Sequence, residues 1–409
     1  MKYGSLSQYF TGVATKRLSA VEADPDTSNQ HEFNGVNGLR LILGTERLAD
    51  IPARFVWLGA ENEGFTEDSL VTWYDSRLKN PKRSPEYRLY FRSNPVMEMA
   101  GAGDLLVVAR RPSGELIIVV AAQGSTVENQ LLWLFGLPAQ EGMGFEVSEI
   151  ENGHDAQIDF AARFILDELQ IEIQEPDAEY LDTLLDRYRG RFPTTAEFSS
   201  FARDTVSDVS PGDDPDGALI AWLEQEERLF RRLERHVVSE RLREGFMDGD
   251  GADVDVDGFI KFSLSVQNRR KSRSGLALEN HLEQVFVAQS VSYSRGAFTE
   301  NNAKPDFLFP GSAEYDDIDF PASQLTMLGV KSTCKDRWRQ VLSEAARIPH
   351  KHLLTLEPGI SVNQTEEMQA QNLQLVLPER LHDTYRPEQR AWLMDLAGFI
   401  DHVAAAQGG

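Results

Sequence analysis

The chain has 409 residues, enough for about two or three domains, and its hydrophobic fraction of 41% is ordinary for a soluble globular protein. Its single cysteine, Cys334, excludes a disulfide framework and any metal site built from several cysteines. The formal net charge of -24 disfavours nucleic acid as a partner if the charge is spread evenly. The acidic residues instead gather at 204–216 and 248–257, and basic residues gather elsewhere.

The N-terminus has neither the basic nor the apolar segment of a secretion signal. The longest apolar runs, such as 116–122, have the length of a strand and not of a membrane-spanning helix. We therefore expect a soluble, cytoplasmic protein that does not contact a membrane.

Residues 1–150 have the pattern of a β-rich domain. Turn-forming pairs that contain Gly, Asn or Pro separate short apolar stretches at 39–43, 54–58, 87–91, 104–109 and 115–122. This spacing is typical of a sandwich or a small barrel.

The period changes after residue 150. Residues 161–169 and 180–189 have helical spacing, and an acidic segment rich in Pro and Gly follows at 207–217. We expect a helical connector at 151–212 and a second domain at 213–409.

The second domain alternates helices and strands. We expect helices at 218–244 and 275–290, with an acidic loop at 248–257 between them. Further along, strands are predicted at 306–309, 325–331, 352–356 and 373–377, with a helix from 336 to about 348 between the second and third. This alternation predicts an α/β core.

A Pro-Asp pair and a lysine mark two neighbouring predicted strands, because Asp306 opens one and Lys331 closes the next. Metal-dependent phosphodiester hydrolysis needs carboxylate oxygens for Mg²⁺ and benefits from a lysine that orients water and offsets negative charge. The second carboxylate of such a motif is expected at position 329, which is Gly329. Glu279 on the 275–290 helix could replace it. Taken singly, Asp306 is as easily a turn residue, and Glu279 a solvated carboxylate.

Three separate segments resemble the catalytic domain of the EcoRII restriction endonuclease family, and they match in order and spacing. They are 268–283, 304–310 and 330–340. The resemblance implies a nuclease of the PD-(D/E)xK type whose second acid has moved to a helix, which would explain Gly329. It further implies that Asp306 and Glu279 hold Mg²⁺, that Lys331 is the catalytic lysine, and that Tyr315 belongs to the active site.

The resemblance also implies that Lys335, Asp336 and Arg337, with Arg339 beside them, read C·G base pairs. The chemistry agrees, because arginine matches the O6 and N7 acceptors of guanine and a carboxylate accepts from cytosine N4. The alternative is a charged helix start without a binding role.

A basic cluster precedes the predicted 275–290 helix. It consists of Arg269, Arg270, Lys271 and Arg273, with no acid between them. We expect it to contact DNA phosphates, and the alternative is an exposed basic loop.

The N-terminal domain has a basic stretch of its own, with six basic residues and one acid between positions 77 and 92. Its candidate DNA-binding residues are Arg77, Lys82, Arg83, Arg88 and Arg92, to which Lys16, Arg17 and His31 are added. This combination resembles the B3-like effector-binding domain of the same family. The alternative is a charged face on an ordinary barrel.

The sequence hypothesis is therefore a multidomain protein with a mostly-β B3-like pseudobarrel followed by an α/β restriction-endonuclease-like domain. It predicts a Mg²⁺-dependent endonuclease that cuts duplex DNA at a short C·G-rich site after its N-terminal domain engages a second site. Since a palindromic site mirrors two-fold symmetry, we expect a homodimer. The alternatives are a modification-dependent endonuclease that senses methylated cytosine, a non-cleaving DNA-binding regulator, and an acidic interaction scaffold.

Overall fold

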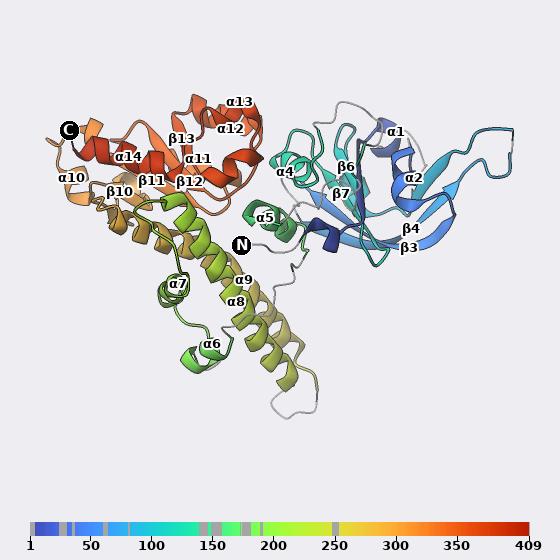
Figure 1. Cartoon of the computed structure of the whole chain (residues 1–409), viewed down its shortest axis with the longest axis horizontal. Helices are drawn as coiled ribbons and strands as arrows, with labels where there is room; N and C mark the ends of the chain where they lie inside the picture. The colour runs from blue at the N-terminus through green and yellow to red at the C-terminus, as the bar shows by residue number, and fades with distance from the viewer. Residues whose placement is uncertain are drawn as a thin grey trace. The chain divides into compact units, whose positions relative to one another are not determined.

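A computed structural model describes most of the chain (Figure 1). The described residues are 5–23, 31–34, 37–59, 64–80, 82–138, 146–148, 158–171, 173, 181–188, 191–247 and 253–408. They form two compact units. Unit 1 comprises Met1–Gln174, Pro358–Thr365 and Thr384–Arg386, and unit 2 comprises Glu175–Glu357, Glu366–Asp383 and Pro387–Gly409.

Within the described residues, unit 1 is built on an eight-stranded sheet in the order β2-β5-β4-β3-β7-β6-β1-β8. Its neighbouring strands are antiparallel except for the parallel pair β3 and β7. The strands are β1 (Gly12–Arg17), β2 (Glu32–Phe33), β3 (Leu48–Leu58), β4 (Phe65–Asp75), β5 (Tyr87–Phe91), β6 (Leu105–Arg110), β7 (Leu116–Ala121) and β8 (Glu146–Ser148).

Both faces of this sheet are buried. Along β6, Leu105 and Val107 belong to one apolar cluster, and Leu106 and Val108 belong to another, because successive side chains of a strand point to opposite faces. Short helices contribute to the two clusters: η1 (Leu6–Gln8), α1 (Ala20–Ala23), α2 (Asn37–Leu43), α3 (Pro95–Met99), α4 (Thr126–Leu134) and α5 (Phe160–Glu168).

One predicted strand of unit 1 is wrong, because residues 39–43 belong to helix α2. Leu39, Ile42 and Leu43 lie three and four positions apart, so a helix places all three on one face, and all three are buried in the second cluster. The predicted strands at 54–58, 87–91, 104–109 and 115–122 correspond to β3, β5, β6 and β7.

Within the described residues, unit 2 holds a five-stranded mixed sheet in the order β13-β12-β11-β10-β9. The β11–β12 and β12–β13 pairs are parallel, whereas β10 is antiparallel to both β9 and β11. The strands are β9 (Ser294–Arg295), β10 (Phe307–Phe309), β11 (Thr326–Lys331), β12 (Lys351–Thr355) and β13 (Leu373–Val376). Short elements join them: η2 (Glu300–Asn302), α10 (Ser312–Asp316), η3 (Ala322–Gln324), α12 (Val362–Ala370), η5 (Glu379–Thr384) and α13 (Pro387–Arg390).

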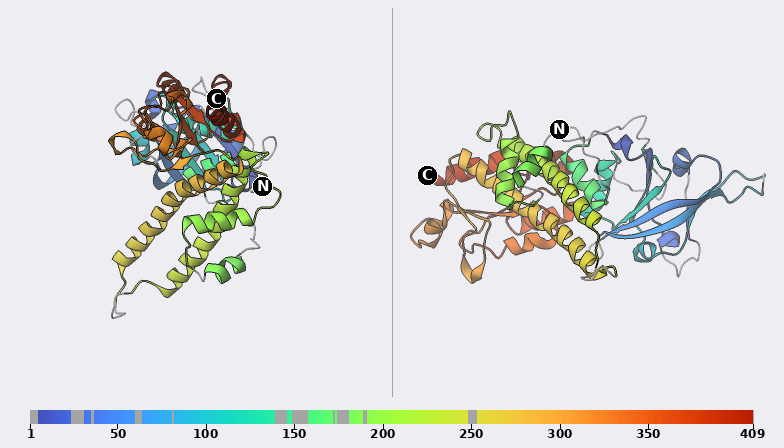
Figure 2. Two further views of the ribbon diagram at one scale, coloured as in Figure 1. Left: turned by 90° about the vertical axis from the view of Figure 1, so that its left-hand side faces the viewer. Right: turned by 90° about the horizontal axis from the view of Figure 1, so that it is seen from below.

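Two long helices, α8 (Pro215–Glu244) and α9 (Val256–Ala288), form a hairpin in unit 2. Figure 2 shows them, green to yellow, lying side by side from two further directions. Helices α6 (Leu181–Tyr188) and α7 (Thr195–Asp204) pack against the hairpin. The side chains of Asp214 and Asp255 cap the N-termini of α8 and α9 by accepting a backbone N–H.

Helix α9 begins 19 residues before the predicted start at 275. The apolar residues of its first turns, Val256, Phe259, Ile260 and Leu264, have helical spacing but are exposed. The polar run 267–275 separates them from the predicted helix. The predicted helix at 336–348 is too long. The structure has only η4 (Lys335–Arg337) and α11 (Trp338–Val341) before the chain turns. Ala345, with a φ of 47°, is incompatible with a continuing helix.

The C-terminal part of α9 covers one face of the unit 2 sheet. Phe286 of α9 lies with its ring centroid 5.2 Å from those of both Phe307 and Phe309 on β10. Phe399 of α14 (Leu396–Gln407) lies 5.6 Å from Phe309 on the same face. Among the helices that the structure describes, none combines the length and apolar character needed to cross a membrane.

Candidate functional site

Asp306 and Lys331 meet where β10 begins and β11 ends. Because Phe307 pairs with Leu328 in this antiparallel ladder, Asp306 comes opposite Gly329, two residues before Lys331. Lys331 Nζ lies 2.9 Å from Asp306 Oδ2, and the N–H of Val330 donates to the same oxygen at 2.6 Å. Within the described residues Asp306 Oδ1 accepts no hydrogen bond, so the carboxylate is held by one oxygen and offers the other.

The structure explains Gly329. A Cβ at this position would lie 2.8 Å from Cγ2 of Val341 in α11, closer than real side chains approach. An acid cannot stand two residues before Lys331, because the segment that starts with α11 packs against the strand there. The same segment carries Glu344, three residues after Val341.

Glu344 is a further carboxyl near Lys331 and Asp306, and it is not among the residues predicted from the sequence. Burial raises the pKa of its carboxyl to about 7, with Lys331 opposing the shift and the charge of Asp306 adding to it. Its Oε2 atom is buried and has no hydrogen-bond partner within the described residues. In the sequence, the one indication of it is the missing acid at position 329, which indicates that a carboxylate comes from another segment.

Glu279 is connected to Asp306 through β9. Its Oε2 accepts from Arg295 Nη2 at 2.9 Å, and the same guanidinium also binds Glu283. Arg295 pairs with Phe307 across the two strands, and the next N–H, of Gly296, donates to the carbonyl of Asp306 at 2.9 Å. Helix α9 thus presents Glu279 to Arg295 of β9, which balances its charge.

Tyr315 supports the turn that carries Glu344. Its hydroxyl donates to Glu300 Oε2 at 2.5 Å, and the same carboxylate oxygen accepts from the N–H of Ala346 at 3.2 Å. The guanidinium of Arg347 donates to the carbonyl of Tyr315. Burial and the bond to Glu300 raise the pKa of Tyr315 to about 12, so the phenol stays protonated and acts as a donor.

The donor set fits a magnesium ion. Asp306 Oδ1 and Glu344 Oε2 are carboxylate oxygens without hydrogen bonds in the described part of the chain, and Mg²⁺ is commonly held by one or two carboxylates, water and phosphate oxygens. Within that part, no three His, Cys, Asp or Glu side chains converge as a complete protein cage for a metal.

The Lys335–Arg337 turn lies just beyond the end of β11. Lys335 and Arg337 are exposed, and Arg337 Nη2 donates to the carbonyl and hydroxyl oxygens of Thr333 at 2.7 and 2.5 Å. The side chain of Asp336 lies outside the described part. Arg339 is exposed as well, and its guanidinium binds Glu367 at 2.8 Å. The residues predicted to read bases thus follow directly on the strand that carries Lys331.

The basic cluster at 269–273 lies inside α9, so the alternative of an exposed basic loop is wrong. Arg273 is buried and binds Glu226 Oε1 at 2.9 Å, so its charge is used within unit 2 and is not available to a phosphate. Arg270 binds Glu234 at 2.7 Å, and Arg269 lies over the ring of Phe192. Lys271 is exposed on the same helix.

Three predicted DNA-binding cations of unit 1 are used in internal ion pairs. Lys16 is 2% exposed, and its Nζ binds Glu22 at 2.7 Å. Arg17 binds Glu128 through both terminal nitrogens, and Arg88 binds Glu32 at 2.5 Å. An ionised side chain inside a protein needs a counter-charge. Lys16 is therefore structural in unit 1, which corrects its prediction as a DNA-binding residue, whereas Arg17 and Arg88 are only half-buried.

The other cations of unit 1 lie at the surface. Lys82, Arg83 and Arg92 are exposed, and Arg77 forms a half-exposed pair with Glu86. His31 packs its half-buried ring against Phe91.

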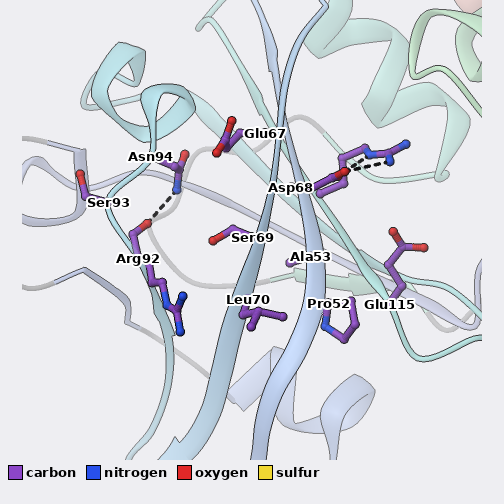
Figure 3. Close-up of a pocket in the computed structure, with 11 residues that line it drawn as sticks. Pro52, Ala53, Glu67, Asp68, Ser69, Leu70, Arg92, Ser93, Asn94 and Glu115 are labelled. Carbon is purple, nitrogen blue, oxygen red and sulfur yellow. Dashed lines mark hydrogen bonds and ion pairs between the residues drawn. The ribbon is translucent and has the colours of Figure 1, made fainter. Parts of the chain in front are cut away.

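Arg92 borders an open pocket of about 590 Å³ between β3, β4 and the segment that follows β5 (Figure 3). Its lining includes Glu67, Asp68 and Glu115, and Asp68 binds Arg54 at 2.8 Å. The three acids make this pocket unsuited to a phosphate backbone.

Comparisons with known proteins show what this chain is similar to. A family profile described as EcoRII C terminal matches residues 230–400. The type II restriction enzyme EcoRII of Escherichia coli is 40% identical over 380 residues, which cover 92% of this chain and 85% of that protein.

Two solved structures are less similar to this chain. One is metal-depleted Ecl18kI in complex with uncleaved, modified DNA, with 18% identity, a TM-score of 0.44 and coverage of 55% of this chain and 83% of that one. The other is a complex of restriction endonuclease PspGI with substrate DNA, with 15% identity, a TM-score of 0.44 and coverage of 53% and 94%. Since both TM-scores are low, the assignment rests on the sequence match over nearly the whole chain. On that ground, this chain belongs to the EcoRII family of type II restriction enzymes.

Proposed function

We propose that this type II restriction enzyme is a Mg²⁺-dependent endonuclease that hydrolyses phosphodiester bonds of duplex DNA at a short C·G-rich site. The observation that carries the proposal is the placement of Asp306, Lys331 and Glu344 at one end of β10 and β11. A non-cleaving regulator would have no need of a lysine and two carboxylates in this arrangement. The arrangement corresponds to a PD-(D/E)xK-type site in which the second acid comes from outside the strand.

Each group has a separate role in the proposed reaction. Asp306 and Glu344 would hold Mg²⁺, and Glu279, paired with Arg295, would add negative charge from α9. When bound, Mg²⁺ supplies positive charge for the scissile phosphate. Lys331, held 2.9 Å from Asp306, presents its ammonium group to orient water and to offset the charge that develops on the phosphate. Tyr315 fixes the turn that positions Glu344.

DNA recognition is assigned to the surface next to this site. Lys335, Asp336 and Arg337 would contact base edges from the turn after β11, and Arg339 follows them. Exposed Lys271 and half-buried Arg269 on α9 would contact phosphates.

Residues 1–150 are proposed as a B3-like effector-binding domain, followed by a connector at 151–212 and the nuclease domain at 213–409. The surface cations Lys82, Arg83 and Arg92, with Arg77 and His31, would bind a second DNA site. A palindromic target would be cut by a homodimer, with one strand for each subunit.

Cleavage of phage DNA by matched variants tests this proposal. Asp306→Ala and Glu344→Gln should each lower the cleavage rate at least about 1,000-fold, because each removes a carboxylate that holds the metal. Both variants should bind the same DNA in EDTA as tightly as the wild type. Asp401→Ala removes an exposed carboxylate of unit 2 and should cut normally. Cleavage retained by Asp306→Ala would overturn the assignment of the site.

The same digest is run on DNA with and without cytosine methylation, and the ends are mapped. Cutting of unmethylated DNA at C·G-rich sites supports the proposal. Cutting of methylated DNA alone would instead establish a modification-dependent enzyme.

A further inference from the structure

Glu357 has no role in the reaction described so far, yet it holds the start of the Lys335–Arg337 turn. It follows the end of β12 and is 4% exposed. The backbone N–H groups of Cys334 and Lys335 both donate to its Oε2, at 2.5 and 3.1 Å. Successive N–H groups that converge on one point form a site that favours a negative charge. The turn is therefore attached to the unit 2 core through one buried carboxylate.

The conformation of this turn needs such a support. Lys335 has a φ of 38°, which residues with a Cβ rarely adopt. Glu357 binds the N–H of this residue, and on the other side Arg337 binds the oxygens of Thr333. The two interactions fix the backbone of the turn from both of its ends.

Glu357 also relates the turn to the catalytic strand. Lys331 pairs with Thr355 in the parallel β11–β12 ladder, and the N–H of Glu357 donates to the hydroxyl of Thr355 at 3.2 Å. The carboxylate that holds the turn thus starts two residues beyond the partner of Lys331. A shift of Glu357 would move the turn relative to the lysine.

We propose that Glu357 is a positioning residue that determines sequence specificity. Its carboxylate sets the backbone of the Lys335–Arg337 turn, so that the side chains of the turn meet base edges while Lys331 meets the scissile phosphate. This inference rests on the proposed function, in which the turn reads base pairs. Bidentate contacts to bases tolerate little displacement, and contacts to phosphates tolerate more.

The measured quantity is the ratio of cleavage rates at the preferred site and at sites that differ by one base pair. It is obtained by sequencing the ends released from a randomised duplex library by the full-length enzyme with Mg²⁺. Glu357→Ala should lower this ratio at least about tenfold, because a displaced turn loses its contacts at the preferred site. Glu357→Gln should stay within about threefold of the wild type, because an amide oxygen can still accept both N–H groups.

A purely structural role would give a different result, and Asp216→Ala shows what it looks like. Asp216 is also a buried carboxylate of unit 2 that accepts backbone N–H groups, from Glu379, Leu396 and Ala397. Its removal should lower the melting temperature and leave the ratio unchanged. If Glu357→Ala also leaves the ratio unchanged, the positioning role is refuted.

Two further variants complete the test. Arg337→Ala tests whether the turn reads bases at all, and an unchanged ratio in this variant refutes that role. If Arg337→Ala lowers the ratio while Glu357→Ala keeps the wild-type ratio, only the role of Glu357 is refuted. If Glu357→Ala does not fold, Glu357→Asp withdraws the carboxylate by one methylene and should still lower the ratio. A wild-type ratio in Glu357→Asp then overturns the inference.

Discussion

At the residue scale, the partner of a charged side chain decides what that side chain can do. Lys16 and Arg273 stand in basic clusters of the sequence, yet each is buried against a glutamate. Lys82 and Lys271 look no different in the sequence and are exposed. Burial of a charge is tolerated only with a counter-charge, and the counter-charges Glu22 and Glu226 come from other segments.

His352 provides a residue-scale prediction about pH. Burial lowers the pKa of this imidazole to about 3, with His402 and His350 adding to the shift. The unfolded chain, in which the pKa is about 6.5, therefore takes up the proton first, and stability is lost as the pH falls from about 6.5 toward 3. At pH 5 the loss amounts to about 2 kcal/mol.

Urea unfolding of the wild type and His352→Leu at pH 7 and pH 5 measures the loss of stability that protonation of His352 causes. The free energy of unfolding of the variant minus that of the wild type should rise by about 2 kcal/mol from pH 7 to pH 5, because leucine has no proton to take up. The rings of His350 and His402 lie about 5 Å from His352 and stay in both proteins. An identical difference at the two pH values would contradict the prediction.

At the element scale, α9 joins the structural and the catalytic parts of unit 2. Its middle carries Arg273 and His281, which both contact Glu226 of α8, at 2.9 and 2.7 Å. The same stretch carries half-buried Glu279, which binds Arg295 of β9. One helix therefore pairs with α8 through buried side chains and with β9 through a carboxylate.

Glu226→Ala should lower the free energy of unfolding by about 3–5 kcal/mol, because it leaves Arg273 buried without its counter-charge. The adjacent Glu227→Ala is the matched control. Glu227 forms a partly exposed pair with Arg231 one turn along α8, worth about 0.5 kcal/mol or less. Urea unfolding of both variants gives the comparison, and similar losses would show that the buried pair contributes nothing particular.

At the scale of the whole molecule, a net charge of -24 has to coexist with DNA binding. The acidic residues repel a phosphate backbone at long range, so binding depends on the few cations that reach the surface. We expect weak affinity for unrelated duplex DNA and a strong dependence on salt.

The salt dependence distinguishes surface cations from buried ones. Lys82→Ala and Arg83→Ala should each make the plot of log affinity against log salt shallower by about one, because each removes a phosphate contact. Lys16→Met should lower stability and leave the slope unchanged. Anisotropy titrations of a labelled duplex over a range of salt provide the slopes. A shallower slope for Lys16→Met would show that this residue contacts DNA after all.

Much of the fold could be predicted from local pattern, because the spacing of apolar residues differs between strands and helices. β5 matches its prediction residue for residue, and the neighbouring Asp306 and Lys331 were found from their places at the ends of predicted strands. The wrongly predicted elements are those in which the spacing of apolar residues is ambiguous or interrupted. Residues 39–43 suit a strand or a helix, and the polar run at 267–275 interrupts the apolar period of α9.

The sequence by itself determined the family, most of the strands, and the aspartate and lysine of the site, since these depend on residues close together in the chain or on matched segments. Only the tertiary structure decided where another carboxylate comes from and which cations face outward. The contact of Gly329 with Val341 excludes an acid on the strand, and the turn that follows brings Glu344 to Asp306 and Lys331 instead. Packing between distant segments produces such contacts, and no local pattern records them.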